Sequence, residues 1–228
     1  MPTDDQIQAL RNTLERYTHL PRHKADAHFL RRLRSLQQWE VVDMRRRHAS
    51  ACASQTEYQA VLDYYLSELH QGLPLDGMIE RGPQGLEHAR RMNKSFSLFA
   101  NAMEFSVLSA VLQDRLTGAL DDKPLTADYY AEALLHCDDR AERVRRLELL
   151  VELGHQCAPH IRSRMIYTGF KLLKGMFRSV GLAEIHSSLD VGFRQLRDVS
   201  RLAQILATVA DLERKQLEAS LASREAAA

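Results

Sequence analysis

The stretch "SFSLFANAMEFSVLSAVLQDRLTGAL", which begins at Ser95, constrains the fold more than any other part of the chain. Between Ser95 and Leu112 it is apolar on nearly every helical face, and Glu104 is the one charged residue there. A helix that is apolar all round is normally buried inside a protein. The sequence therefore predicts a central apolar helix near 95–119, against which the other segments pack.

The remaining segments carry apolar residues at three- and four-residue spacing, which indicates amphipathic helices. Glycine and proline are few, 10 and 6, and we find no run of alternating β-branched residues. The sequence predicts an all-α fold: a single bundle of eight to nine helices over 1–222, with 223–228 as a disordered tail. Single helices are expected over Lys24–Ala51 and Pro159–Val180, and a short one near Gln84–Met92.

Several residues predict where helices begin and end. Thr126 suits the N-cap of a helix that runs to about Cys137, and Gly181 suits the position just after a helix C-terminus. Ser54 and Glu57 have the spacing of a capping box, which predicts a helix from about Ser54 to Gln71.

Composition argues against several classes of protein. The formal net charge is +1, so the strong positive field typical of nucleic-acid binding is absent and a nucleic-acid partner is not expected. Cys52, Cys137 and Cys157 are far apart and form no CxxC pair, which disfavours a disulfide framework and a zinc ribbon. The polar start "MPTDDQIQAL" does not resemble a secretory signal, and no run of 18 apolar residues occurs. We expect a cytoplasmic protein.

Glu104 is the first candidate for a functional role, because a charge inside a core is destabilising by several kcal/mol unless it is paired. Asn101 lies on the same helical stripe, one turn earlier. Glu104 either has a structural role, as the ion-pair partner of an arginine or the cap of a nearby helix end, or it binds a metal, acts as a general base or orients a ligand in a pocket.

The stretch "YYLSELH" supplies four further candidates for ligand binding, namely Tyr64, Tyr65, Glu68 and His70. The alternative is that both tyrosines lie at the margin of the core, with each hydroxyl bonded to a partner or to water.

A metal centre is the alternative function. Glu152 and His155 form an ExxH motif, and di-iron bundles combine two such motifs with two further glutamates inside a helical bundle. Glu68, Glu104 and Glu132 offer the additional carboxylates, but the sequence has a single ExxH. No cofactor is expected otherwise, and iron is expected in this alternative, which would make the protein a helical oxidase or oxygenase.

A basic amphipathic segment is the third candidate. No acidic residue occurs from Leu153 to Ala183, and Arg164, Lys171, Lys174 and Arg178 fall within about one quadrant of a helical wheel. Such a face beside a broad apolar stripe favours contact with an anionic membrane or an acidic partner. A helix packed on the core with a solvated basic edge has the same pattern.

The final apolar stripe has two interpretations. Leu202, Ile205, Val209 and Leu212 follow a three-four-three spacing. This stripe predicts either the last core-facing helix or the seam of a homodimer.

The stretch Tyr64–His70 resembles the signature of the FFLEELY-motif proteins, a family of uncharacterised bacterial proteins. The two tyrosines stand for the two phenylalanines and Leu66, Glu68 and Leu69 match, whereas Ser67 and His70 depart from the pattern. "NAMEFSVLSAVL", "LELLVELG", "IYTGFKLLKGMFRSVGL" and "VGFRQLRDV" are similar to later family segments, but "LDGMIERGPQG" lacks the expected Arg-Asp pair. The resemblance implies an all-helical bacterial cytoplasmic protein and no particular activity.

Together these patterns favour a non-catalytic binding or adaptor protein. It would hold an apolar or anionic ligand, a membrane surface or a protein partner, either in a pocket near Glu104 and Asn101 or on the basic surface from Arg164 to Arg178. The sequence identifies neither the ligand nor the partner.

Overall fold

The computed structural model describes residues 2–81 and 95–225, and side chains as far as residue 222. These residues form twelve α-helices, a 3-10 turn and one π-helical segment, and no strand occurs among them. The all-α prediction is confirmed, but the predicted count of eight to nine helices is wrong. The short helix expected near Gln84–Met92 lies outside the described residues.

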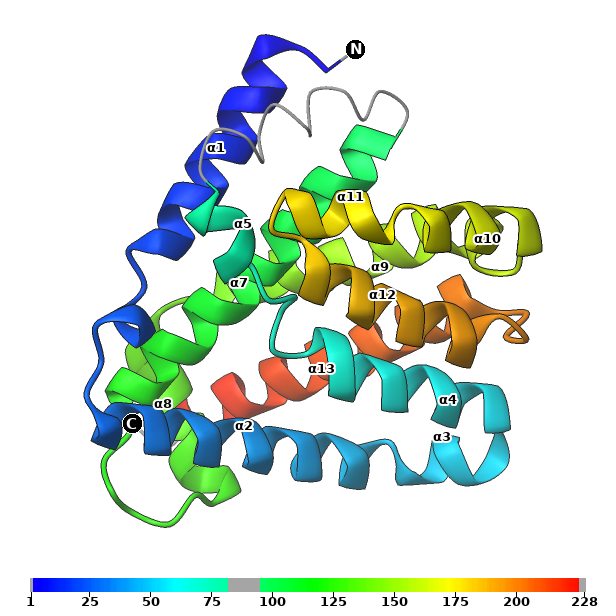
Figure 1. The fold of residues 1–228 in the computed structure, drawn as a ribbon. Coiled ribbons are helices and arrows are strands. Elements are labelled where there is room, and N and C mark those ends of the chain that lie inside the picture. The colour runs from blue at the N-terminus through cyan, green and yellow to red at the C-terminus, as the bar shows by residue number, and fades with distance from the viewer. Residues whose placement is uncertain (1, 82–94, 226–228) are drawn as a thin grey trace.

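Figure 1 shows the order of the elements. The first half of the chain forms α1 (Asp4–Thr18), the 3-10 turn η1 (Pro21–His23), α2 (Ala27–Arg47), α3 (Ala49–Ser54), α4 (Thr56–Tyr64), the π segment η2 (Tyr65–Leu69) and α5 (Asp76–Glu80). The second half forms α7 (Phe96–Ala119), α8 (Ala127–Cys137), α9 (Arg140–Ile161), α10 (Arg164–Leu172), α11 (Lys174–Ser179), α12 (Ala183–Leu196) and α13 (Leu202–Glu225).

The helix count exceeds the prediction because two expected long helices are broken. The helix expected over Lys24–Ala51 is interrupted at His48, whose buried ring lies 2.5 Å from the Tyr58 hydroxyl and 2.8 Å from Glu213. The helix expected over Pro159–Val180 is also interrupted, because α9 continues through Pro159 to Ile161 and α10 begins after it. The Ser163 hydroxyl then caps α10 by accepting a hydrogen bond from the amide of Ile166 at 3.3 Å.

Two of the three expected helix-end signals are confirmed. The Thr126 hydroxyl accepts a hydrogen bond from the amide of Tyr129 at 3.2 Å and so caps α8. Gly181 has a φ of +78°, and the amide of Leu182 reaches back to the Phe177 carbonyl, which is the Schellman pattern. The capping box is wrong: α4 has no side-chain cap, and the Glu57 carboxylate instead accepts hydrogen bonds from Ser200.

The helix α7 occupies the centre, as predicted. It packs against α1, α2, α8 and α9, and α13 packs against α9 on the far side. By length and composition α7 is the one helix among the described residues that could cross a membrane, with 61% of its most apolar window buried. Buried core helices pass the same test.

The buried charge in α7 is not the one expected. Glu104 lies at the edge of the core, where its side chain keeps 35% of its surface exposed. Asp114 is the carboxylate that is deeply buried, and it accepts hydrogen bonds from the Arg22 amide at 2.9 Å and from Arg22 Nε at 2.8 Å. The expectation that Glu104 is a core charge is therefore wrong, because α7 turns that position toward α9 and solvent.

The last helix faces the core over most of its length. Leu202, Ile205 and Val209 are buried against the α4–α9 side, whereas Leu212 is 39% exposed. The stripe thus packs within the chain, and the homodimer stays a prediction.

Candidate functional site

The helices α10 and α11 lie toward one edge of the fold in Figure 1, and their exposed residues are basic and apolar. We use the term α10–α11 surface for these outward residues: Arg164, Met165, Lys171, Leu172, Leu173, Lys174 and Arg178. Met165 and Leu172 are each 81% exposed and Leu173 is 42% exposed. Large apolar side chains this exposed are seldom found in a group on a short segment, and such patches mark contact surfaces.

The opposite side of these two helices is held to α12 by aromatic packing. The Phe170 ring stacks on His186 with centroids 4.2 Å apart, and it also contacts Phe177 and Phe193. His186 Nε2 donates to the Phe170 carbonyl at 3.1 Å, which fixes the proton on that nitrogen. The predicted apolar stripe is therefore divided: Phe170 and Phe177 pack inward, whereas Met165 and Leu172 remain outside.

The four predicted basic residues all lie exposed on this surface. The Lys171 ammonium lies 4.7 Å from the centre of the Tyr167 ring, a cation–π contact. Arg164, Lys174 and Arg178 form no ion pair with any residue in the described part of the chain. Their charge is thus not balanced by nearby described carboxylates.

Glu104 and Asn101, the other predicted site, belong to a partly exposed network around Arg145. Arg145 binds both oxygens of Glu104, at 3.0 and 3.2 Å, and donates from its remaining terminal nitrogen to Glu152 at 2.9 Å. Asn101 donates to the other oxygen of Glu152 at 3.1 Å. These bonds hold α7 against α9, which is the structural pairing that the sequence left open for Glu104.

The five residues of the iron alternative are not all brought together. Glu104 and Glu152 share Arg145, whose guanidinium lies between their carboxylates. Glu132 and His155 are exposed on α8 and α9, and Glu68 lies on the π segment. Across residues 2–81 and 95–225, no group of three His, Cys, Asp or Glu side chains is arranged to hold a metal. The iron centre stays a prediction.

The stretch "YYLSELH" adopts a π-helical turn. The amide of His70 bonds to the Tyr65 carbonyl at 2.7 Å, five residues earlier, and π turns of this kind occur frequently at functional sites. Tyr64 points toward α12, where its ring packs against Gly192, and burial raises its pKa well above the usual value. Tyr65 and His70 point the other way, into a buried polar cluster.

Glu40 of α2 is the centre of this cluster. Its carboxylate lies 3.1 Å from His70 Nε2 and accepts hydrogen bonds from Tyr130 at 2.9 Å and Gln113 at 3.4 Å. Burial alone would raise the pKa of Glu40, but the bonds from His70 and Tyr130 outweigh it and lower that pKa from 4.5 to about 2. Glu40 is therefore ionised at neutral pH.

Arg146 of α9 closes the cluster from the other side. Its Nη2 donates to the His70 carbonyl at 2.7 Å and lies 3.2 Å from His70 Nδ1, while its Nε donates to Ser109 at 2.8 Å. Because an arginine nitrogen only donates, His70 Nδ1 accepts and the imidazole proton lies on Nε2, facing Glu40. His70 thus links a carboxylate to a guanidinium.

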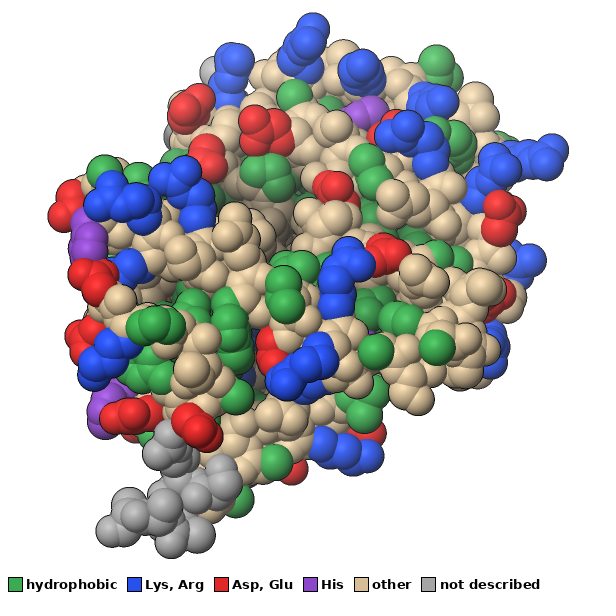
Figure 2. Space-filling view, turned by 90° about the horizontal axis from the view of Figure 1, so that it is seen from below, with side chains coloured by type: hydrophobic (Ala, Val, Ile, Leu, Met, Phe, Trp, Pro, Cys, Tyr) green, Lys and Arg blue, Asp and Glu red, His purple; other side chains and the backbone are tan. Residues whose placement is uncertain are grey.

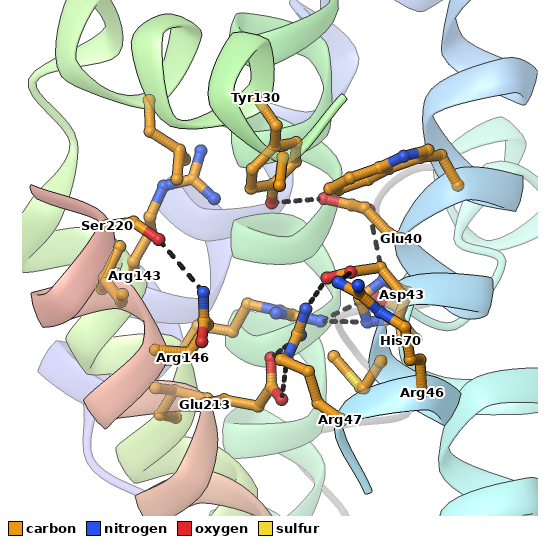
Figure 3. A pocket seen from close by; sticks show the side chains of 17 residues that line it. Glu40, Asp43, Arg46, Arg47, His70, Tyr130, Arg143, Arg146, Glu213 and Ser220 are labelled. Atoms are coloured by element: carbon orange, nitrogen blue, oxygen red, sulfur yellow. Dashed lines mark hydrogen bonds and ion pairs between the residues drawn. The ribbon is translucent and has the colours of Figure 1, made fainter. Parts of the chain in front are cut away.

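A cavity of about 120 Å³ opens beside this cluster between α2, α8, α9 and α13 (Figure 3). A second polar group lines it, in which Arg47 binds Asp43 and Glu213, and Glu213 also bonds to the buried His48. Trp39, the single tryptophan, stacks on Tyr130 at 4.7 Å and faces the same cavity.

Sequence reasoning found Tyr65 and His70 but missed Glu40, Tyr130 and Arg146. These residues come from α2, α8 and α9, 30 to 90 positions away from their partners along the chain. No local pattern marks them, apart from a glutamate beside the only tryptophan in "QQWEVV".

Comparison with known proteins adds a family model but no activity. A family model described as a domain of unknown function (DUF8198) matches residues 19–227. No curated protein and no solved structure matches significantly.

Proposed function

Because the chain belongs to the family described as a domain of unknown function (DUF8198), which assigns no activity, we propose a function from the molecular surface itself. The protein is a binding protein that attaches to an anionic membrane surface through the α10–α11 surface. The resemblance to the FFLEELY-motif proteins, and the bacterial origin and cytoplasmic location that it implies, stay predictions beside this proposal.

The observation that carries the proposal is the exposure of Met165 and Leu172, each 81%, on a segment without acidic residues. Their positions differ by seven, so both project from the same face of α10. Arg164 and Lys171 stand beside them in the sequence, with long side chains that reach the lipid headgroups while the apolar groups enter the acyl boundary. This is the pattern of a helix that lies in a membrane interface.

The charges and the apolar groups contribute comparable energies. A lysine or arginine near an anionic surface contributes about 1 kcal/mol, and a fully buried large apolar side chain contributes about 1.5 to 3 kcal/mol. Four cations and two protruding side chains therefore support reversible binding that depends on salt and on lipid charge.

An acidic protein is the competing partner for the same charges. We favour the membrane because Met165 and Leu172 are each 81% exposed on the short helix α10, whereas a protein partner is usually met by a complementary packed surface. The face shown in Figure 2 carries positive and negative side chains interspersed, as expected for a net charge of +1. The absence of acidic residues along α10 and α11 is therefore a local feature of that segment.

Vesicle co-sedimentation tests the proposal. Lys171→Glu with Lys174→Glu changes the surface by four charge units, which predicts about a thousandfold weaker binding to phosphatidylglycerol vesicles. Arg11→Glu with Arg140→Glu is the matched control, because both arginines are exposed and lie on α1 and α9.

Equal losses in the two double variants, or no binding by the wild-type protein, would overturn the proposal. Binding of the wild-type protein to soluble polyglutamate but not to vesicles would assign the α10–α11 surface to an acidic protein instead.

A further inference from the structure

The cavity between α2, α8, α9 and α13 has an unusual set of charges. Four arginines line it, namely Arg46, Arg47, Arg143 and Arg146, together with the three carboxylates Glu40, Asp43 and Glu213 (Figure 3). Met44, Leu134, Leu147 and Leu217 also line it, so the walls are mixed, and the charged side chains suit a hydrated or charged occupant.

All three carboxylates are already engaged. Glu40 is bonded to His70 and Tyr130, as described above. Asp43 binds Arg46 and Arg47, and Glu213 binds Arg47 and His48. Arg47 uses its Nε and both of its terminal nitrogens in these bonds. None of these groups needs a further partner.

Arg143 and Arg146 differ from Arg47, because each has one unused nitrogen, and they differ from Arg46 in that both lie on α9. Arg143 binds Asp139 through Nε at 2.6 Å and Nη2 at 3.0 Å, and its Nη1 has no partner among the described residues. Arg146 uses Nε and Nη2 for Ser109, Tyr65 and His70, none of which is a carboxylate, and its Nη1 likewise has no described partner. Arg146 has no carboxylate within ion-pair distance in the described part of the chain.

The two arginines lie three positions apart on α9 and both line the cavity. Side chains with this spacing are neighbours on one helix face, and like charges placed so are mutually destabilising. An anion that accepts hydrogen bonds from both Nη1 groups would reduce this repulsion and give Arg146 a directly bonded negative partner, beside the more distant Glu40.

We propose that this cavity binds a small oxyanion, a phosphate or carboxylate group, through Nη1 of Arg143 and Nη1 of Arg146. A volume of about 120 Å³ has room for several water molecules, which is enough for one such group. This site is separate from the α10–α11 surface and does not depend on the membrane proposal.

Trp39 provides the readout, since it is the only tryptophan and lines the cavity. Inorganic phosphate and acetate would each be titrated at constant ionic strength, with tryptophan fluorescence and melting temperature recorded. A saturable fluorescence change is expected with at least one of the two ions. At 100 times Kd the melting temperature should rise by roughly 5 to 10 °C.

The variant Gln216→Glu tests the location, because Gln216 of α13 lines the cavity and the change replaces an amide by a carboxylate of the same shape. The new negative charge should repel the anion and weaken binding at least tenfold. Gln204→Glu is the control, since Gln204 is an exposed residue of the same helix. This pair avoids Arg146→Gln, which would also remove the bonds to His70 and Tyr65.

The response to phosphate or acetate should also persist in the Lys171→Glu, Lys174→Glu variant, which separates this cavity from the membrane surface. Absence of any response in the wild-type protein overturns the inference. Equal affinities in the Gln216→Glu and Gln204→Glu proteins also overturn it, because the anion would then bind elsewhere.

Discussion

Met165 and Leu172 lie about two turns apart on one face of α10, and each keeps 81% of its surface in contact with solvent. The same helix buries Phe170 against His186 on its other face. The helix is therefore anchored to the protein by one side and leaves apolar groups outside on the other. That relationship is the basis of the membrane proposal.

The first prediction concerns these two side chains. Met165→Ser with Leu172→Ser should leave the free energy of unfolding within about 0.5 kcal/mol of the wild-type value, because neither side chain is buried. Vesicle binding should weaken about a hundredfold, which corresponds to about 3 kcal/mol of lost apolar burial. Vesicle titration and urea unfolding measure the two effects.

The control for this variant is Val42→Ser. Val42 is 67% exposed on α2 and lies outside the α10–α11 surface, so this change should not affect vesicle binding. If the Val42→Ser protein loses as much affinity as the double variant, general surface hydrophobicity rather than this surface is responsible.

The second prediction compares two acidic residues of α7. Glu104 and its partner Arg145 are 35% and 38% exposed, so Glu104→Ala should lower the free energy of unfolding by no more than about 1 kcal/mol. Asp114 is 1% exposed, and Asp114→Ala should lower it by about 3 to 5 kcal/mol, because Arg22 is left without its partner. Urea unfolding of both variants measures which substitution lowers the free energy of unfolding more. A larger loss in Glu104→Ala than in Asp114→Ala would contradict the assignment of Asp114 as the buried charge.

The third prediction concerns the close approach of α12 to the end of α4. A Cβ at Gly192 would lie 2.7 Å from the Tyr64 ring, so Gly192→Ala should lower the free energy of unfolding by about 1 to 3 kcal/mol. Gly118→Ala is the matched helical control, with no atom within 4 Å of the added Cβ, and it should raise stability by about 0.5 to 1 kcal/mol. In thermal unfolding, the melting temperature should fall for Gly192→Ala and rise for Gly118→Ala. Equal changes would show that Tyr64 does not occupy this position.

The fourth prediction is a pH dependence that comes from Glu40. The ordinary pKa of 4.5 applies to the unfolded chain, and the folded pKa is about 2. Because the folded value is the lower one, the ionised carboxylate contributes its full stability above pH 4.5 and loses it as the pH falls toward 2. The free energy of unfolding lost is on the order of 3 kcal/mol, because each pKa unit of difference between the folded and unfolded chain corresponds to about 1.4 kcal/mol.

Glu40→Gln tests this assignment. The variant should be less stable at neutral pH, because an amide cannot accept from both His70 and Tyr130 as the carboxylate does. Its free energy of unfolding should fall less steeply than that of the wild-type protein between pH 4.5 and 2. Parallel curves in urea titrations at each pH would show that Glu40 is not the responsible group.

Sequence patterns predicted the helical fold and the central position of α7 because both depend on local periodicity. Thr126 and Gly181 were predicted for the same reason, since a cap depends on a few adjacent residues. The number of helices was not predictable, because the break at His48 depends on Tyr58 and on Glu213, which is 165 positions away.

The candidate sites were likewise predictable only where they depend on residues of a single segment. The cations of α10 and α11 were found from one segment, whereas the Glu40 cluster needs five segments to meet. Glu104 drew attention because its neighbours in the sequence are apolar, but its environment is set by Arg145 of another helix. Burial of a charge therefore could not be inferred from the polarity of its own helix alone.

The most direct test of the membrane proposal is the partition of the wild-type protein onto vesicles that contain increasing fractions of phosphatidylglycerol. The account predicts negligible binding to purely zwitterionic vesicles, a steep rise with the anionic fraction, and a loss of binding when salt is raised from 0.1 to roughly 1 M, where the Debye length shrinks to about 3 Å. Binding that is absent at every composition, or independent of lipid charge and salt, would contradict it.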